Sequence, residues 1–178
     1  MIDGPAGMEC LPDGLRLQSD RVDFRTAGGL SIQALALMPQ HRAQVKWLLR
    51  RDEDCATLCA SDRHVRADTL ANEWYDARDT ACSFLLATYP EGMPVGLLCL
   101  EHGRVSYLVE LQYRAQGIAS AALRWLSGHV SPGQLPLHAQ VDRNNVASRR
   151  ALEAAGFRFV GLASGHAHSA PLLNFVRR

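Results

Sequence analysis

The hydrophobic pattern of the chain switches at Gly117 from that of a strand to that of a helix, and then back again. Residues 105–109 read as a strand, whereas the apolar positions after Gly117 share one face of a helix. These positions are Ile118, Ala122, Trp125 and Leu126. A Pro-Gly pair should end the helix, and alternating apolar residues over 135–141 predict the next strand. A strand–helix–strand step of this kind is expected to be a right-handed parallel crossover, which indicates an α/β domain.

Further strands and helices are expected on both sides of this unit. Two alternating stretches around a Pro-Glu-Gly turn predict a β-hairpin, which continues through a second turn into the strand at 105–109. The remaining elements are a strand over 30–37, a helix from Pro39, a helix over 68–78, a helix over 145–155 closed by Gly156, and strands around 157–162 and 172–176. In the helix from Pro39, Val45, Leu48 and Leu49 fall on one face. We therefore predict one α/β domain over residues 26–178, with a mixed central sheet of six to seven strands flanked by about four helices. Residues 1–25, rich in Gly, Pro and Asp, should form a partly ordered extension.

The composition of the whole chain excludes several kinds of partner. The formal net charge of the 178 residues is +1, so the bulk charge favours neither nucleic acid nor an anionic membrane. No apolar run approaches the roughly 20 residues that span a bilayer, and residues 1–14 lack the pattern of a signal peptide. The five cysteines are odd in number and scattered, which is typical of reduced thiols and does not suggest a zinc site. We expect a cytoplasmic protein without a metal.

The turn between the strand at 105–109 and the following helix has the features of an anion-binding site. When a helix begins directly after a short turn, its free backbone N–H groups and the positive end of its dipole point at one place. Gly117 and Ala119 leave the backbone there accessible to a phosphate. A closely packed turn between a strand and a helix would look the same, so these residues alone leave both interpretations open.

Two motifs resemble those of the GNAT superfamily of N-acyltransferases. The first, Arg114-x-x-Gly117-x-Ala119, is similar to the family's pyrophosphate motif, Gln/Arg-x-x-Gly-x-Gly/Ala. The second begins with Asn145-x-x-Ser148 and ends in Gly-Phe, and it resembles the family's Asn-x-x-Ser/Ala signature on a short helix. Its residues are most similar to those of the branch that includes the ribosomal-protein N-terminal acetyltransferases. The two motifs stand in the family's order and at about its spacing.

The resemblance implies a single GNAT-like domain with a site for acyl-CoA. The backbone amides at 116–120 would bind the pyrophosphate of CoA, with Arg114 beside them. The segment 107–109 would form hydrogen bonds with the pantetheine arm, because the parallel strands of Val109 and Val141 splay apart there. Asn145 would hold the pantetheine or the turn, and it could equally be a helix N-cap. The implied CoA-binding residues are Tyr107, Leu108, Val109, Arg114, Ala115, Gln116, Gly117, Ile118, Ala119, Ser120 and Asn145.

The sequence departs from the family pattern at the catalytic positions. Leu152 stands where many members carry a Tyr acid, and residues 103–104 stand where some carry a Glu base. Ser148 is the candidate acid, and Glu110 and His138 are the candidate bases. Each has a structural alternative: Ser148 could be a capping residue in a first helical turn, His138 a hydrogen-bonded strand residue, and Glu110 a solvated carboxylate.

The function that the resemblance implies is the transfer of an acetyl or other short acyl group from acyl-CoA to a primary amine. The amine would attack the thioester directly in a ternary complex, with acetyl-CoA as the expected co-substrate. The acceptor, a small molecule or a protein N-terminus, stays open, and exposed strand edges would allow a homodimer. The alternative is a catalytically weak or inactive module of GNAT fold that binds acyl-CoA or a partner, because the usual Tyr and Glu are missing.

Overall fold

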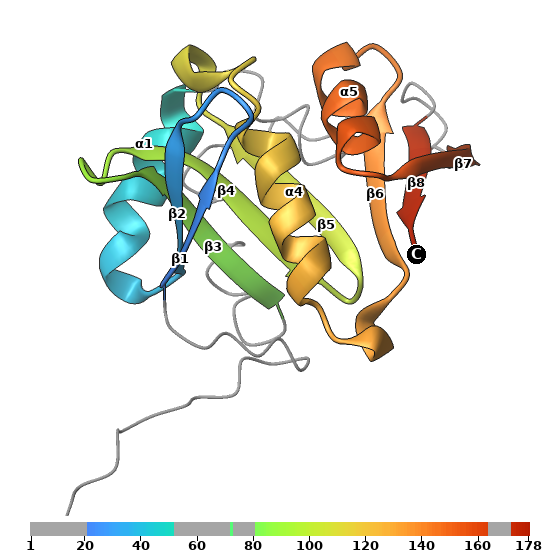
Figure 1. Cartoon of the computed structure of the whole chain (residues 1–178), viewed down its shortest axis with the longest axis horizontal. Coiled ribbons are helices and arrows are strands. Elements are labelled where there is room, and N and C mark those ends of the chain that lie inside the picture. Colours follow the sequence, from blue (N-terminus) through green and yellow to red (C-terminus); the bar gives the residue numbers. More distant parts are fainter. Residues whose placement is uncertain (1–20, 52–71, 73–80, 164–171) are drawn as a thin grey trace, which may run out of the picture.

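The computed structural model of the protein describes residues 21–51, 72, 81–163 and 172–178. Eight strands form one sheet in the order β1-β2-β3-β4-β5-β6-β8-β7 (Figure 1). They are β1 (Arg21–Arg25), β2 (Ser31–Ala36), β3 (Ala81–Thr88), β4 (Pro94–Glu101), β5 (Arg104–Val109), β6 (Leu137–Asp142), β7 (Arg158–Ala163) and β8 (Leu172–Arg177). Neighbouring strands are antiparallel except for β5 and β6, which are parallel. The parallel pair confirms the parallel crossover that the hydrophobic pattern predicts.

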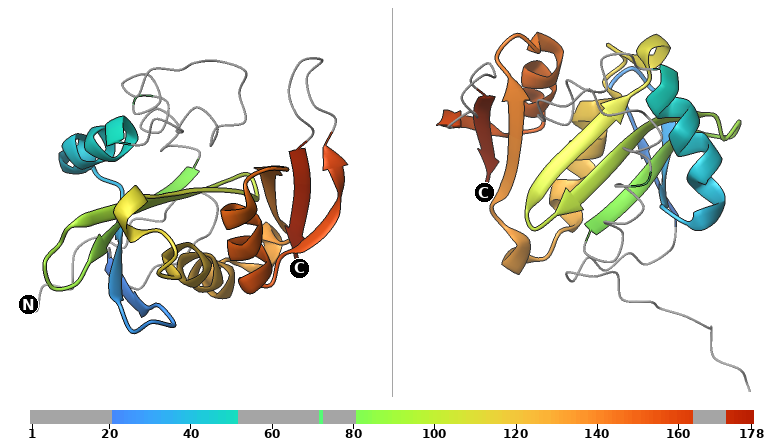
Figure 2. Two further views of the ribbon diagram at one scale, coloured as in Figure 1. Left: turned by 90° about the horizontal axis from the view of Figure 1, so that it is seen from above. Right: turned by 180° about the vertical axis from the view of Figure 1, so that it is seen from behind.

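The helices lie on opposite faces of the sheet (Figure 2). α1 (Arg42–Arg51) covers one face, and α4 (Ile118–His129) and α5 (Val146–Ala154) cover the other. Short 3₁₀ turns precede α1, α4 and β6; they are η1 (Pro39–His41), η3 (Leu111–Tyr113) and η4 (Pro132–Gln134). In these described ranges, no helix is both long enough and apolar enough to cross a membrane.

Each face of the sheet buries its own set of apolar side chains. On the α1 face, the helix contributes Val45, Leu48 and Leu49, which are the three residues that the sequence predicts on one helical side. On the other face, Trp125 of α4 packs edge-on against Phe84 of β3, with 5.2 Å between the ring centroids. Because the strands alternate, odd-numbered positions of β5 face α4 and even-numbered positions face α1.

β5 and β6 begin side by side and then part. One pair of residues, Arg104 and His138, is in register between the two strands. Beside it, the His138 N–H donates to the Gly103 carbonyl at 2.7 Å. The other edge of β5 stays paired with β4 as far as Val109. A gap therefore opens between the C-terminal ends of the two parallel strands, as expected around Val109 and Val141.

The sheet has eight strands, and the sequence predicts six to seven. The strand that the sequence does not predict is β1, the one nearest the N-terminus. β1 lies in residues that the sequence analysis places in the N-terminal extension. Its only apolar residues are Val22 and Phe24, and two alternating positions are too few to predict a strand. Tertiary packing holds it: the ring of Phe24 stacks on Trp125 with 6.1 Å between centroids. Three α-helices occur in the described part of the chain. The helix expected over 68–78 falls outside the described residues apart from the single position 72.

Candidate functional site

A cleft of about 550 Å³ lies where β5 and β6 part, between the first turn of α4 and the length of α5. It takes in most of the residues that the sequence assigns to the CoA site: Tyr107, Leu108, Val109, Arg114, Ala115, Gly117, Ile118, Ala119, Ser120, Asn145 and, from the catalytic candidates, Ser148. Gln116 is exposed and does not line the cleft; its side chain donates to the Gln112 carbonyl at 3.2 Å.

One end of the cleft is formed by free backbone N–H groups. Gly117 is the N-cap of α4 and has a left-handed backbone with φ 78°, which glycine adopts without a steric penalty. The first helical hydrogen bond runs from the Ala121 N–H to the Gly117 carbonyl at 3.0 Å. The amides of residues 118–120 therefore precede the helical hydrogen-bond pattern and point out of the helix end. They form, with the helix dipole, a site suited to a phosphate.

The edge of β5 offers further unused backbone groups along the cleft. The Glu110 N–H bonds to Val95 of β4, so the alternating groups of Tyr107 and Val109 point to the opposite side, into the gap. No strand pairs with this edge beyond Arg104 in the described ranges. The Val109 carbonyl already accepts a hydrogen bond from Arg114 Nε at 3.0 Å, which leaves the Val109 N–H and the backbone groups of Tyr107 for a ligand. This edge can therefore bind an extended ligand that carries amide groups.

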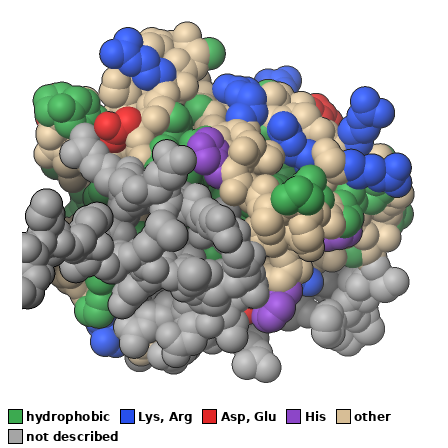
Figure 3. Space-filling view, turned by 60° about the horizontal axis from the view of Figure 1, so that its bottom comes forward, with side chains coloured by type: hydrophobic (Ala, Val, Ile, Leu, Met, Phe, Trp, Pro, Cys, Tyr) green, Lys and Arg blue, Asp and Glu red, His purple; other side chains and the backbone are tan. Residues whose placement is uncertain are grey.

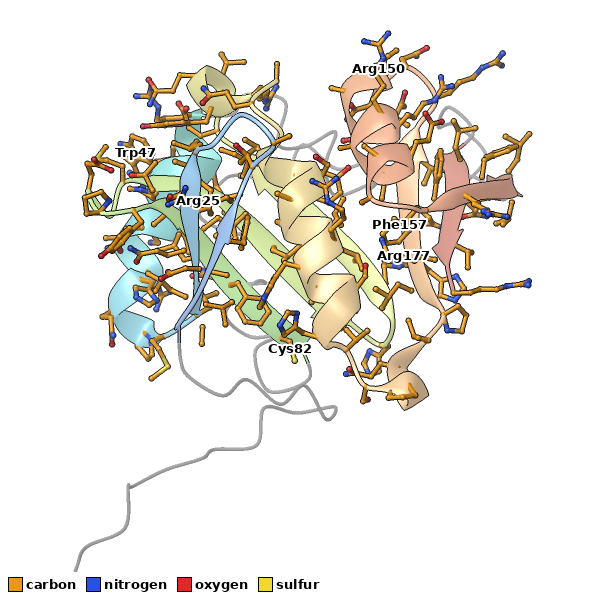
Figure 4. The ribbon with its side chains drawn as sticks, in the orientation of Figure 1. Arg25, Trp47, Cys82, Arg150, Phe157 and Arg177 are labelled. Atoms are coloured by element: carbon orange, nitrogen blue, oxygen red, sulfur yellow. The ribbon has the colours of Figure 1, made fainter. Side chains whose placement is uncertain are left out.

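Two arginines place positive charge on the cleft. Arg114 comes from the turn before α4, and Arg150 projects from α5 (Figure 4). On the face of the molecule that Figure 3 shows, basic side chains also predominate over acidic ones in the described part of the surface. The two arginines in the lining of the cleft would attract a ligand with several phosphates.

Tyr107 connects the two walls of the cleft, and Asn145 caps the helix that forms one of them. The Tyr107 hydroxyl donates to the Ser148 carbonyl on α5 at 3.1 Å, and burial raises the pKa of Tyr107 to about 12. Asn145 is the N-cap of α5, where its Oδ1 accepts from the Ser148 N–H at 3.0 Å. The N-cap alternative is therefore realised, and Asn145 lines the cleft as well.

The structure separates the three catalytic candidates. Ser148 lines the cleft. Glu110 is 2% exposed and lies on the α1 face, where its carboxylate accepts from Arg51 Nε at 3.0 Å and from the Gln112 N–H at 2.9 Å. His138 is exposed at the paired end of β6, away from the gap. Neither Glu110 nor His138 is among the residues that line the cleft.

Several residues line the cleft that the sequence analysis did not single out: Tyr113, Asp142, Asn144, Ala147, Arg150, Ala151 and Ala154. Asp142 and Asn144 could have been found, because ligands bind at the carboxyl ends of parallel strands, and Asp142 is the last residue of β6 while Asn144 lies in the turn after it. The helix residues carry no such signal. In the described residues, no group of three or more His, Cys, Asp or Glu side chains could hold a metal ion.

Comparison with known proteins decides the fold. No protein-family model and no curated protein sequence matches the chain. Among solved structures, RimJ of Mycobacterium smegmatis in complex with CoA-disulfide is 21% identical with a TM-score of 0.68, covering 88% of this chain and 86% of its own. The chain has the GNAT fold.

Two further structures with this fold show how widely its members differ. The ribosomal-protein-S5-alanine acetyltransferase of Vibrio fischeri is 14% identical with a TM-score of 0.69, covering 88% of this chain and 96% of its own. The aminoglycoside acetyltransferase AAC(6')-Ib, in complex with paromomycin and acetyl-CoA, is 11% identical with a TM-score of 0.66, covering 82% and 92%. The GNAT fold of this chain is thus shared with proteins whose acceptors differ, and it does not define an acceptor.

Proposed function

We propose that this protein transfers an acetyl or other short acyl group from acyl-CoA to a primary amine. The observation that carries the proposal is the cleft between the parted strands, which ends at the free amides of the α4 N-terminus. The fold neighbours that bind CoA or acetyl-CoA support it. Acetyl-CoA is the proposed co-substrate, in a protein that we place in the cytoplasm and that could pair through a strand edge.

In this proposal the donor lies along the cleft in an extended form. Its pyrophosphate binds the amides of residues 118–120, with Arg114 as the charged partner. The pantetheine amides bind the free edge of β5 at Tyr107 and Val109, in place of the strand pairing that β6 no longer supplies. Arg150 is placed to meet a further phosphate of the donor.

The chemistry then needs positioning and proton transfers from the amine and to the CoA sulfur. The ammonium group first loses a proton to water, and the neutral nitrogen attacks the thioester carbon. The C–N bond forms, the nitrogen loses a second proton to water, the C–S bond breaks, and the CoA sulfur leaves as a thiolate that takes a proton. Holding both reactants in place contributes about 7–11 kcal/mol to the lowering of the barrier. The Val109 N–H points into the gap and would polarise the thioester carbonyl. Ser148 is the proposed proton donor to the thiolate, since it is the catalytic candidate that lines the cleft.

The test combines binding with turnover. Millimolar CoA should raise the melting temperature, because a ligand that binds only the folded state stabilises it. Acetyl-CoA with n-butylamine, spermidine or a peptide with a free N-terminus should then release the CoA thiol. Gly117→Glu should abolish both effects by placing a negative side chain at the phosphate site. A wild-type protein that does not respond to CoA would contradict the proposal.

One observation keeps the inactive module as a second candidate. Leu152, at the position of the family's usual Tyr acid, is 1% exposed and packs in the core, so it leaves no proton donor there. A protein that binds CoA tightly and releases no thiol with any of these amines would fit that candidate.

A further inference from the structure

A second, smaller cavity of about 40 Å³ adjoins the cleft in the gap between β5 and β6. The two cavities share four lining residues, namely Tyr107, Asp142, Asn145 and Ser148. The small cavity also reaches Ser106 and Gln140, which alternate along their strands with the core residues Val105 and Ala139 and so belong to the α1 face. It therefore leads from the cleft through the sheet toward the face opposite α4 and α5, and its size suits an amino group.

The charges of the two cavities differ. Both arginines, Arg114 and Arg150, line the large cleft and not the small cavity. Asp142 is the one acidic side chain among the described residues that line either cavity. A cation that enters a partly buried gap needs an anionic partner, because it loses part of its hydration there. Asp142 is placed to supply that partner where the two cavities meet.

The local structure holds Asp142 in place and leaves half of its carboxylate available. Asp142 ends β6, and its Oδ1 accepts from the Asn144 N–H at 2.7 Å in the turn before α5. The side chain is half-buried. No hydrogen bond or ion pair joins Oδ2 to another residue of the described chain. The turn thus orients a carboxylate whose second oxygen can still accept a hydrogen bond.

We propose that Asp142 binds the ammonium group of the acceptor, which reaches the acyl group through the small cavity from the α1 face of the sheet. This inference rests on the proposed acyl transfer and adds the residue that binds the ammonium group of the acceptor. Donor and acceptor then enter from opposite faces, and a primary amine that is protonated in solution is the class of acceptor that fits. Asp142 acts as a positioning residue for the amine before it loses its proton.

The test separates the charge of Asp142 from its role in the turn. Asp142→Asn keeps an oxygen that can accept the Asn144 N–H and removes only the negative charge, whereas Asp142→Ala removes both. With n-butylamine as acceptor, Asp142→Asn should raise KM by about tenfold or more and change kcat much less. CoA affinity and melting temperature should stay those of the wild type. With hydroxylamine, which carries no charge at pH 8, the two proteins should react equally well after subtraction of the uncatalysed rate.

Glu153→Gln is the matched control, because it removes the same charge from an exposed position on α5 that lines neither cavity. It should leave KM unchanged.

If the wild type binds CoA and acetylates n-butylamine while Asp142→Asn keeps the wild-type KM, the assignment of Asp142 fails and the proposed function stands. A loss of CoA affinity or of melting temperature in Asp142→Asn equal to that in Asp142→Ala would assign Asp142 to the turn alone and overturn the inference. A wild type that binds CoA but acetylates neither probe overturns the inference together with the proposed enzyme.

Discussion

Tyr107 shows what a single side chain does at the site. It extends from β5 across the base of the cleft and donates its phenolic O–H to the Ser148 carbonyl at 3.1 Å. Because β5 and β6 have already parted at this point, this bond replaces a strand pairing as a link between the two walls. A buried tyrosine whose hydroxyl is paired stabilises the fold as a neutral phenol and resists ionisation.

The pKa of Tyr107 predicts a loss of stability in alkaline solution. Burial raises this pKa from 10 to about 12, so between these values the folded state holds a proton that the unfolded state has released. Stability from this group is therefore complete below about pH 10 and falls as the pH rises toward 12. Tyr107→Phe should cost about 1 kcal/mol at pH 8, and this difference from the wild type should shrink as the pH is raised. Urea unfolding of both proteins from pH 8 to 11 measures it; a constant difference would contradict the assignment.

At the scale of elements, the path of β5 depends on a glycine in β4. Gly96 pairs with Val109, and a Cβ at Gly96 would clash with the backbone carbonyl oxygen of Leu108. Backbone cannot move aside as a flexible side chain does. The close approach of β4 thus helps to fix the end of β5 whose free edge forms the cleft.

Gly96→Ala should therefore harm both stability and CoA binding. The clash should cost about 2 kcal/mol or more, and the displaced end of β5 should weaken CoA affinity. Gly128→Ala in α4 is the matched control, since its added Cβ meets nothing within 4 Å; it should stabilise the helix by up to about 1 kcal/mol. Urea unfolding and calorimetry with CoA measure the two effects. Equal CoA affinity in Gly96→Ala and the wild type would show that β5 does not depend on this contact.

The elements with sustained periodicity were predictable from the sequence, and the residue contacts were not. α4, the β3–β4 hairpin and the three buried residues of α1 follow directly from apolar spacing. β1 has two apolar positions and is held by the contact of Phe24 with Trp125, about a hundred residues away, which no local pattern records.

The same limit applies to the site. The glycine-containing turn and the polar start of α5 were visible as motifs, because they depend on residues close in sequence. Glu110 could be read as a base or as a solvated carboxylate, because its partner Arg51 is 59 residues distant. Arg51 in turn stacks on Trp47, with its Cζ 4.9 Å from the ring centroid. Such a pairing emerges only when α1 packs on the sheet.

At the scale of the whole molecule, the parted strands divide the sheet into two parts. β1 to β5 form one part, and β6, β8 and β7 with α5 form the other (Figure 1). Among the described residues, few hydrogen bonds link β1 to β5 and α4 with the other part: the strand pairing at His138, the bond of the Tyr107 hydroxyl, and a bond from Arg124 of α4 to the Ala154 carbonyl of α5 at 3.1 Å. A ligand that fills the cleft would contact both parts at once.

This division predicts how the molecule opens and how CoA changes it. Amides of β6, β8 and α5 should exchange hydrogen through a partial opening of lower free energy than the amides of β3 and β4, because only the Arg104–His138 pairing joins β6 and β8 to the rest of the sheet. Saturating CoA should slow exchange in both α4 and α5, because bridging the cleft stabilises the closed arrangement by mass action. Native-state hydrogen exchange with and without CoA measures both effects, and Gly117→Glu serves as the control that should not respond. Protection gained in α4 alone would mean that CoA contacts only one wall and that the two parts of the sheet are not coupled through the site.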